Sequence, residues 1–114
     1  MTNIDTKTLF TAALMLPEPW YIDQVDFREE PGKARTLHIF IKFRQDARFQ
    51  DPAAAGGAKA SSVHDTLPGT WRNMNFFQYP CLIHCDVPRI LGSDGRIRQV
   101  AVPWERAESG FRRL

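Results

Sequence analysis

Long apolar segments are absent from this chain of 114 residues. No stretch approaches the roughly 20 consecutive apolar residues that a membrane-spanning helix needs. The N-terminal residues also lack the basic region followed by an apolar run that marks a signal peptide. The sequence therefore predicts a cytoplasmic protein that makes no membrane contact. A chain of this length is expected to form one domain over residues 1–114.

Cysteine is scarce, since Cys81 and Cys85 are the only two. On one extended strand, at ~3.3 Å per residue, they would lie about 13 Å apart. That separation is too large for a disulfide bond, so we expect both thiols to be reduced.

Charge of one sign is scarce as well. The 15 Lys and Arg residues nearly balance the 13 Asp and Glu residues, which leaves a net charge of +2. The excess lies in residues 86–114, which hold six arginines and four acids. This distribution permits a nucleic-acid contact at that end without requiring one, and it excludes the strongly basic, histone-like class of proteins.

The chain also lacks a recognisable catalytic constellation. His84, Cys85 and Asp86 are consecutive, and neighbouring residues of a strand point to opposite faces, so His84 cannot serve Cys85 as a base. His64-Asp65 is typical of a turn or a cap. Residues 53–60 are rich in alanine and glycine but lack the Gly-Lys-Ser/Thr ending of a phosphate-binding loop. We therefore expect no enzyme activity, no cofactor and no small-molecule substrate.

A short helix is predicted near the N-terminus. The apolar residues of 5–15 have helical spacing. Asp5 or Thr6 can cap this helix, and Pro17 ends it.

A β-hairpin is predicted next. Residues 20–27 suit a strand, and residues 37–43 alternate with a period of two. Pro31-Gly32 favours a turn between them, so the two strands are expected to pair antiparallel. His38 then lies on the solvent-exposed side of its strand.

The second half of the chain is expected to form further strands. The predicted fold is therefore α+β, with the short N-terminal helix packed on a small, mainly antiparallel β-sheet. The remaining expected segments are a flexible loop over 51–62, a strand over 78–90 ending near Pro88, a turn over 91–95, a strand over 97–104 and a polar C-terminal tail over 105–114. The expected core residues are Trp20, Phe27, Leu37, Ile39, Ile41, Phe43, Trp71, Phe76, Phe77, Val100, Val102 and Trp104.

Two blocks carry the most distinctive pattern: Trp71-Arg-Asn-Met-Asn-Phe-Phe-Gln78, and Arg98-Gln-Val-Ala-Val-Pro-Trp104 followed by Ser109-Gly-Phe111. Shorter segments accompany them, namely Leu9-Phe-Thr-Ala-Ala-Leu14, Pro17-Glu-Pro-Trp20, Ala47-Arg-Phe49, Val63-His-Asp-Thr66, Ile83-His84 and Val87-Pro-Arg89. In order and spacing, these segments resemble the N-terminal region of ISL-three-type insertion-sequence transposases. In that family the region is a zinc-ribbon-like module that precedes a helix-turn-helix and a nuclease domain with an acidic triad. The resemblance implies a DNA-associated role without catalysis, because the matching segments contain neither of those two domains.

The zinc ligands of that family are not matched. Its two Cys-x-x-Cys turns fall here at Asp51 and Ala54, and at Gly92 and Gly95. Structural zinc needs four ligands, and of these residues only Asp51 can coordinate. We therefore expect no zinc and a degenerate zinc-ribbon-like fold held by its apolar core. The alternative is a metal site rebuilt from His64, His84, Cys81 and Cys85.

Arginines are the candidate nucleic-acid or partner-binding residues, since they can contact phosphates. The candidates are Arg72, Arg89, Arg96, Arg98 and Arg106. The alternative is a solvated polar face with ion pairs to Asp86, Asp94 and Glu105. Similarly, Trp71-Arg72 and Phe76-Phe77 would either stack on exposed bases or belong to the core.

Two functions remain open at this point. The first is a non-catalytic, stand-alone, DNA-associated binding domain derived from a transposase N-terminus. The second is a small protein-binding inhibitor or regulator from a mobile element or phage, such as an anti-defence protein, that reuses the fold through exposed strand edges or aromatic patches.

Overall fold

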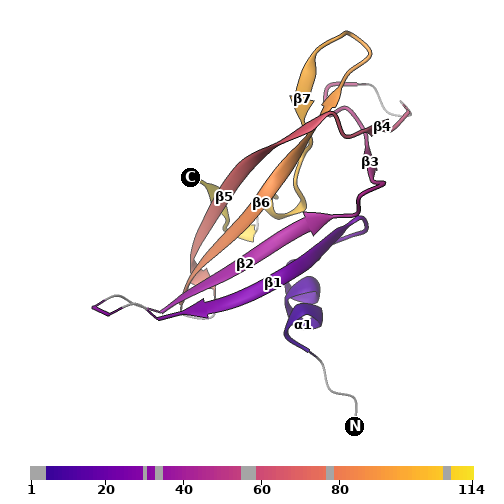
Figure 1. Ribbon diagram of the computed structural model, residues 1–114. Helices are drawn as coiled ribbons and strands as arrows, with labels where there is room; N and C mark the ends of the chain where they lie inside the picture. The colour runs from indigo at the N-terminus through magenta and orange to yellow at the C-terminus, as the bar shows by residue number, and fades with distance from the viewer. Residues whose placement is uncertain (1–4, 30, 33–34, 55–58, 77–78, 107–108) are drawn as a thin grey trace.

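The computed structural model describes residues 5–29, 31–32, 35–54, 59–76, 79–106 and 109–114, without the side chains of 74–76. It contains one α-helix and a mainly antiparallel sheet (Figure 1), so the predicted α+β class is confirmed. Among these residues, no helix has the length and apolar composition needed to cross a membrane.

The helix α1 (Thr6–Ala13) begins where the sequence indicates. The Thr8 backbone N–H donates to Asp5 Oδ1 at 2.7 Å, which satisfies one of the free N–H groups of the first turn. Phe10 and Leu14 are buried and fix the helix to the sheet.

The sheet has the strand order β1-β2-β6-β5-β8, with β7 paired to β6. The predicted hairpin is formed by β1 (Trp20–Arg28) and β2 (Thr36–Phe43), with an irregularity between Ile22 and Gln24. Strand β2 then runs parallel to β6 (Tyr79–Leu91), which pairs antiparallel with β5 (Asp65–Phe76) and with β7 (Ile97–Gln99). The short strand β8 (Arg112–Arg113) completes the far edge beside β5.

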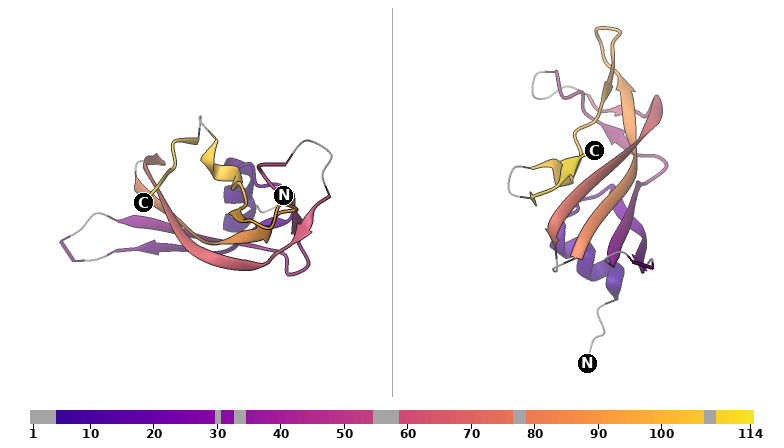
Figure 2. Two further views of the ribbon diagram at one scale, coloured as in Figure 1. Left: turned by 90° about the horizontal axis from the view of Figure 1, so that it is seen from above. Right: turned by 90° about the vertical axis from the view of Figure 1, so that its left-hand side faces the viewer.

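One face of the sheet is covered and the other is not (Figure 2). Helix α1, the 3-10 helix η1 (Pro103–Glu105) and the C-terminal segment lie on the same side, over the hollow of the curved sheet. Trp104 is fully buried at the centre of this side, with ring centroids 5.4 Å from Trp20 and 5.1 Å from Trp71. The opposite face carries no helix in the described part of the chain, so its side chains are available to a partner.

The predicted strand over 97–104 is too long. Strand β7 ends at Gln99, and Pro103 begins a 3-10 helix because proline has no N–H to donate to a strand ladder. The expected shared face of Val100, Val102 and Trp104 survives, since all three side chains are buried against the sheet.

The C-terminal segment is not a free polar tail. Phe111 is 8% exposed, and β8 pairs with β5. The Leu114 backbone N–H also donates to the Thr70 carbonyl at 2.9 Å. Two large apolar residues, Phe111 and Leu114, among mostly polar ones carry too little periodic signal to reveal this strand from sequence.

Two further predictions need correction. Part of the loop over 51–62 is ordered as β4 (Ser61–Ser62), which pairs with β3 (Arg48–Phe49); residues 55–58 lie outside the described residues. Phe27 is not a core residue, because it is 48% exposed and packs edge-on against Tyr79. The predicted core side chains of Phe76 and Phe77 also lie outside the described residues.

Candidate functional site

The uncovered face of the sheet presents its side chains in rows that cross the strands. Residues paired across adjacent strands share a face, and alternate residues point to opposite faces. The first row contains Arg112, Arg72, Leu82, His38 and Asp26. The second row contains Thr70, His84, Phe40 and Gln24. Because Cys81, Ile83 and Trp71 point into the core from the intervening positions, both rows face solvent.

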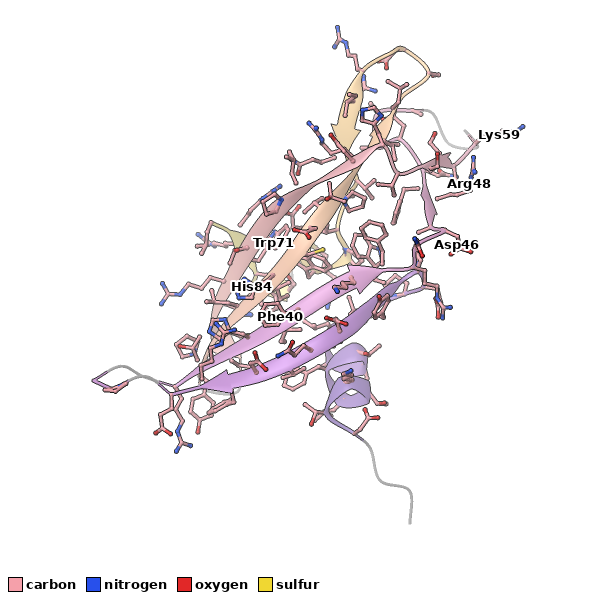
Figure 3. All side chains as sticks on the ribbon, viewed as in Figure 1. Phe40, Asp46, Arg48, Lys59, Trp71 and His84 are labelled. Carbon is pink, nitrogen blue, oxygen red and sulfur yellow. The ribbon has the colours of Figure 1, made fainter. Side chains whose placement is uncertain are left out.

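Three rings form the centre of this surface. The planes of Phe40 and His84 lie 21° apart with centroids 4.8 Å apart, and those of His84 and His38 lie 6° apart with centroids 5.1 Å apart. His38 Nδ1 and His84 Nε2 are 2.8 Å apart, a hydrogen-bonding distance. Figure 3 shows Phe40 and His84 side by side on β2 and β6. We call these three residues the aromatic platform.

His38 lies on the solvent-facing side of β2, as expected, but it is not simply solvent-exposed. Its ring is partly buried against His84, because the parallel pairing of β2 with β6 brings two strands together that are distant in sequence. A hydrogen bond between two imidazoles needs one nitrogen to accept, so it favours at least one neutral ring.

The pKa of His84 is lowered by burial and, to a lesser degree, by the nearby charge of Arg28. The unfolded chain therefore takes up a proton at higher pH than the folded chain. The contribution of His84 to folding is complete above the ordinary histidine pKa of 6.5 and is lost as the pH falls toward the lowered folded-state value.

We therefore expect His84→Gln to flatten the pH dependence of unfolding on the acidic side of neutrality. Urea denaturation in that range measures the effect. A slope unchanged by this substitution would contradict the assignment, and His64→Gln is the control because His64 lies outside the platform.

A depression of about 560 Å³ opens beside the aromatic platform. Gln24, Phe40 and His84 line it from the second row, and Lys42, Thr66 and Asp86 line it from further along the strands. The surface is therefore hollowed next to its rings, with polar groups on both sides.

Positive charge gathers at one end of the first row. Arg72 on β5 and Arg112 on β8 are directly opposite each other and both are exposed. Among the described residues no carboxylate pairs with either one, whereas Lys42 and Arg28 on the same face are bridged to Asp23 and Asp26 at 3.4 Å. Like charges in directly opposed positions of a sheet are destabilising, so this pair is suited to an anion.

The five arginines predicted from sequence are not brought together. Arg89 is bound by both carboxylate oxygens of Asp65, and Arg98 by Asp51 and Asp94. Arg106 donates to the Leu14 and Pro103 carbonyls, both at 3.1 Å. These three make internal contacts, but only the pair of Arg98 with Asp94 is one that the alternative interpretation named, since Arg89 pairs with Asp65 instead of Asp86.

Only two of the five predicted arginines are exposed, and they do not lie together. Arg96 is in the turn between β6 and β7, and Arg72 is in the middle of the sheet. Arg112, Phe40, His38 and His84 were missed as site residues. Their only sequence signal is the alternation of residues 37–43, which places His38 and Phe40 on the same side of one strand.

Trp71 belongs to the core, where it is fully buried and donates from Nε1 to Glu105 Oε1 at 2.6 Å. It therefore presents no ring face to a base. The Phe76-Phe77 part of the same prediction lies outside the described side chains.

The two turns that the resemblance assigns to zinc lie against each other. Ala54 N–H donates to the Asp51 carbonyl and Gly95 N–H to the Gly92 carbonyl, both at 3.0 Å. Arg98 bridges the turns by contacting the carboxylates of Asp51, at 2.8 Å, and Asp94. A Cβ atom built on Gly92 would lie 2.5 Å from Asp51 Oδ2, so no larger side chain fits there without movement.

These residues do not fit a zinc ion, because a guanidinium occupies the space between the turns and itself supplies positive charge. The rebuilt alternative does not form either, since Cys81 and Cys85 point into the core and His84 points to the uncovered face. Burial raises the pKa of both thiols to about 12, which disfavours the thiolates that zinc requires. No group of three or more His, Cys, Asp or Glu residues is placed to hold a metal within the described parts of the chain.

Because they point to opposite faces of the sheet, His84 and Cys85 are kept apart, as the sequence indicates. His64 and Asp65 serve the β5–β6 pairing: the His64 backbone N–H donates to the Arg89 carbonyl at 2.7 Å, and hydrogen bonds from Arg89 lower the pKa of Asp65.

Compared with known proteins, the chain matches no family model, no curated protein and no solved structure.

Proposed function

We propose that this chain is a non-catalytic, DNA-associated binding domain whose contact surface is the uncovered face of the sheet. The observation that carries the proposal is the opposed pair Arg72 and Arg112, exposed and without a carboxylate partner among the described residues. A phosphate between the two guanidiniums would relieve their repulsion through charge-assisted hydrogen bonds. The aromatic platform lies beside this pair on the same face, and the depression lies beyond the platform.

The arrangement of the two turns supports the DNA-associated origin implied by the resemblance. Segments 51–54 and 92–95 are far apart in the sequence, yet they meet through Arg98 where two metal-binding turns of a zinc ribbon would meet. A module that lost its metal but kept this geometry can retain its ancestral type of partner.

Charge removal at the pair tests the proposal. We expect Arg72→Gln combined with Arg112→Gln to weaken DNA binding by an order of magnitude or more. The dependence of log K on log salt should also become shallower by about 0.7 to 0.9, because the pair holds one phosphate, and each lost phosphate contact removes roughly 0.7 for single strands and 0.9 for duplex. Fluorescence anisotropy of end-labelled DNA, measured between about 50 and 200 mM salt, reports both quantities.

Arg96→Gln is the matched control, because Arg96 is exposed but lies in the turn between β6 and β7. It should leave affinity and salt slope nearly unchanged. Absence of binding to any DNA at about 50 mM salt, where phosphate contacts are strongest, would rule out the DNA-associated function.

A protein-binding inhibitor or regulator is the second candidate, favoured by the edge strand β1. This strand pairs only with β2 in the described structure, and it exposes Tyr21 by 42% and Phe27 by 48%. An extended segment of a partner can add to such an edge through backbone hydrogen bonds. DNA binding that fails while a β1 variant loses a stable protein complex would establish this function instead.

A further inference from the structure

We infer that the uncovered face takes single-stranded nucleic acid, with one base stacked on the Phe40–His84 part of the aromatic platform and a neighbouring phosphate between Arg72 and Arg112. The single-stranded nucleic acid would occupy the same face as the DNA of the proposed function, so this inference rests on that proposal. It adds the form of the nucleic acid and the residues that select it.

The spacing of the two rows suits one nucleotide step. Residues two apart on a strand are separated by roughly 6.6 Å, and neighbouring strands by about 4.8 Å. Arg72 pairs with Leu82, two residues before His84 on β6, so Arg72 and His84 lie on a diagonal of roughly 8 Å between adjacent strands. The long arginine side chain can therefore hold the phosphate of a nucleotide whose base contacts His84.

The rings favour an unpaired base over a duplex. A duplex presents phosphates and base edges, whereas its base faces are stacked inside the helix and cannot reach side chains on the surface of a sheet. Aromatic side chains on an open sheet stack on the exposed bases of single strands, and this contact tolerates many sequences because every base has a π-face. Phe40 and His84 are each only partly exposed, so the platform is fixed in place before a base arrives.

The charges across the face give the bound nucleic acid a direction. Arg72 and Arg112, which have no carboxylate partner among the described residues, lie at the end of the first row nearest β8, and the exposed Asp86 borders the depression on the other side of His84. Asp23 and Asp26 are already bridged to Lys42 and Arg28. A phosphate is therefore drawn toward β8, and the polar edge of the base is directed toward the depression.

The test compares an end-labelled oligothymidylate with a hairpin duplex of the same number of phosphates. We expect the single strand to bind at least tenfold more tightly. Phe40→Leu removes the ring but keeps apolar volume, and it should weaken single-strand binding roughly tenfold, as expected for the loss of one base stack. Phe40→Tyr keeps the ring and should restore binding, and Arg96→Gln should change nothing.

A measurement on the unmodified protein makes the test independent of variant folding. In NMR spectra, the ring protons of His84 and His38 should shift upfield when the oligothymidylate is added, because a stacked base imposes its ring current on them. Equal binding of both DNA forms, with no histidine shift and no effect of Phe40→Leu, would overturn the single-strand inference. The proposed function would survive that result if the double arginine variant still lost affinity. No binding of either form would overturn both.

Discussion

Trp104→Ala is expected to lower the free energy of unfolding by about 3–5 kcal/mol, as is typical when a buried tryptophan is truncated to alanine. Trp104 is fully buried, and its ring meets Trp20 and Trp71 edge-on. Truncation leaves a cavity between the 3-10 helix and the sheet. Strands β5 and β1 cannot move in to fill it without losing their pairing with β6 and β2. Urea denaturation followed by circular dichroism measures the loss as a lower midpoint with an unchanged slope.

Two further variants separate packing from hydrogen bonding. Trp104 Nε1 is buried, and no acceptor lies within hydrogen-bonding distance of it among the described residues. Trp104→Phe therefore removes a donor that already lacks a partner, and it should cost clearly less than Trp104→Ala. Leu91→Ala is the surface control, because Leu91 is 49% exposed and should change stability by well under 1 kcal/mol. Equal losses for Trp104→Phe and Trp104→Ala would contradict this packing account.

The parts of the fold that are local in sequence could be predicted. The alternation of residues 37–43, the capping residue Asp5 and the turn at Pro31-Gly32 each act over a few neighbours, and the helix and hairpin follow them. The parallel pairing of β2 with β6 could not be predicted, because it joins residues more than 40 positions apart and depends on how the hydrophobic faces meet in three dimensions.

The candidate site was largely hidden from sequence for the same reason. His38 and His84 become neighbours only through the β2–β6 register, and Arg72 and Arg112 only through the β5–β8 pairing. Two of the arginines that the sequence singled out are held in ion pairs once the chain folds, and the sequence alone does not show which two. Arg89 with Asp65 and Arg98 with Asp94 illustrate this outcome.

Arg98 lies between the two turns at 51–54 and 92–95 and joins them through its guanidinium. Arg98 holds Asp51 and Asp94 together, and the Asp51 side chain is only 12% exposed. The hydrogen bond from Arg98 is the main reason why the pKa of Asp94 is lowered to about 2, with the backbone N–H of Arg96 as a second cause.

Arg98→Met is therefore expected to lower the melting temperature by several degrees at neutral pH, because it keeps the aliphatic stem but leaves two carboxylates facing each other without a cation. The pH profile identifies the cause. In the unaltered protein, Asp94 contributes stability above its ordinary pKa of 3.8, and this contribution is lost as the pH falls toward 2. In the variant that loss should be smaller, so the melting temperatures of the two proteins should converge as the pH falls.

Adding Asp51→Asn to Arg98→Met gives the decisive comparison, because it removes one of the two repelling charges while nearly preserving shape. The double variant should regain much of the lost melting temperature at neutral pH, although Asp51→Asn alone should be destabilising because it weakens the bridge to Arg98. This opposite effect of one substitution in two backgrounds is a coupling that only direct contact produces. Additive effects would show that the turns are held by the surrounding strands β3 and β6 and not by the arginine between them.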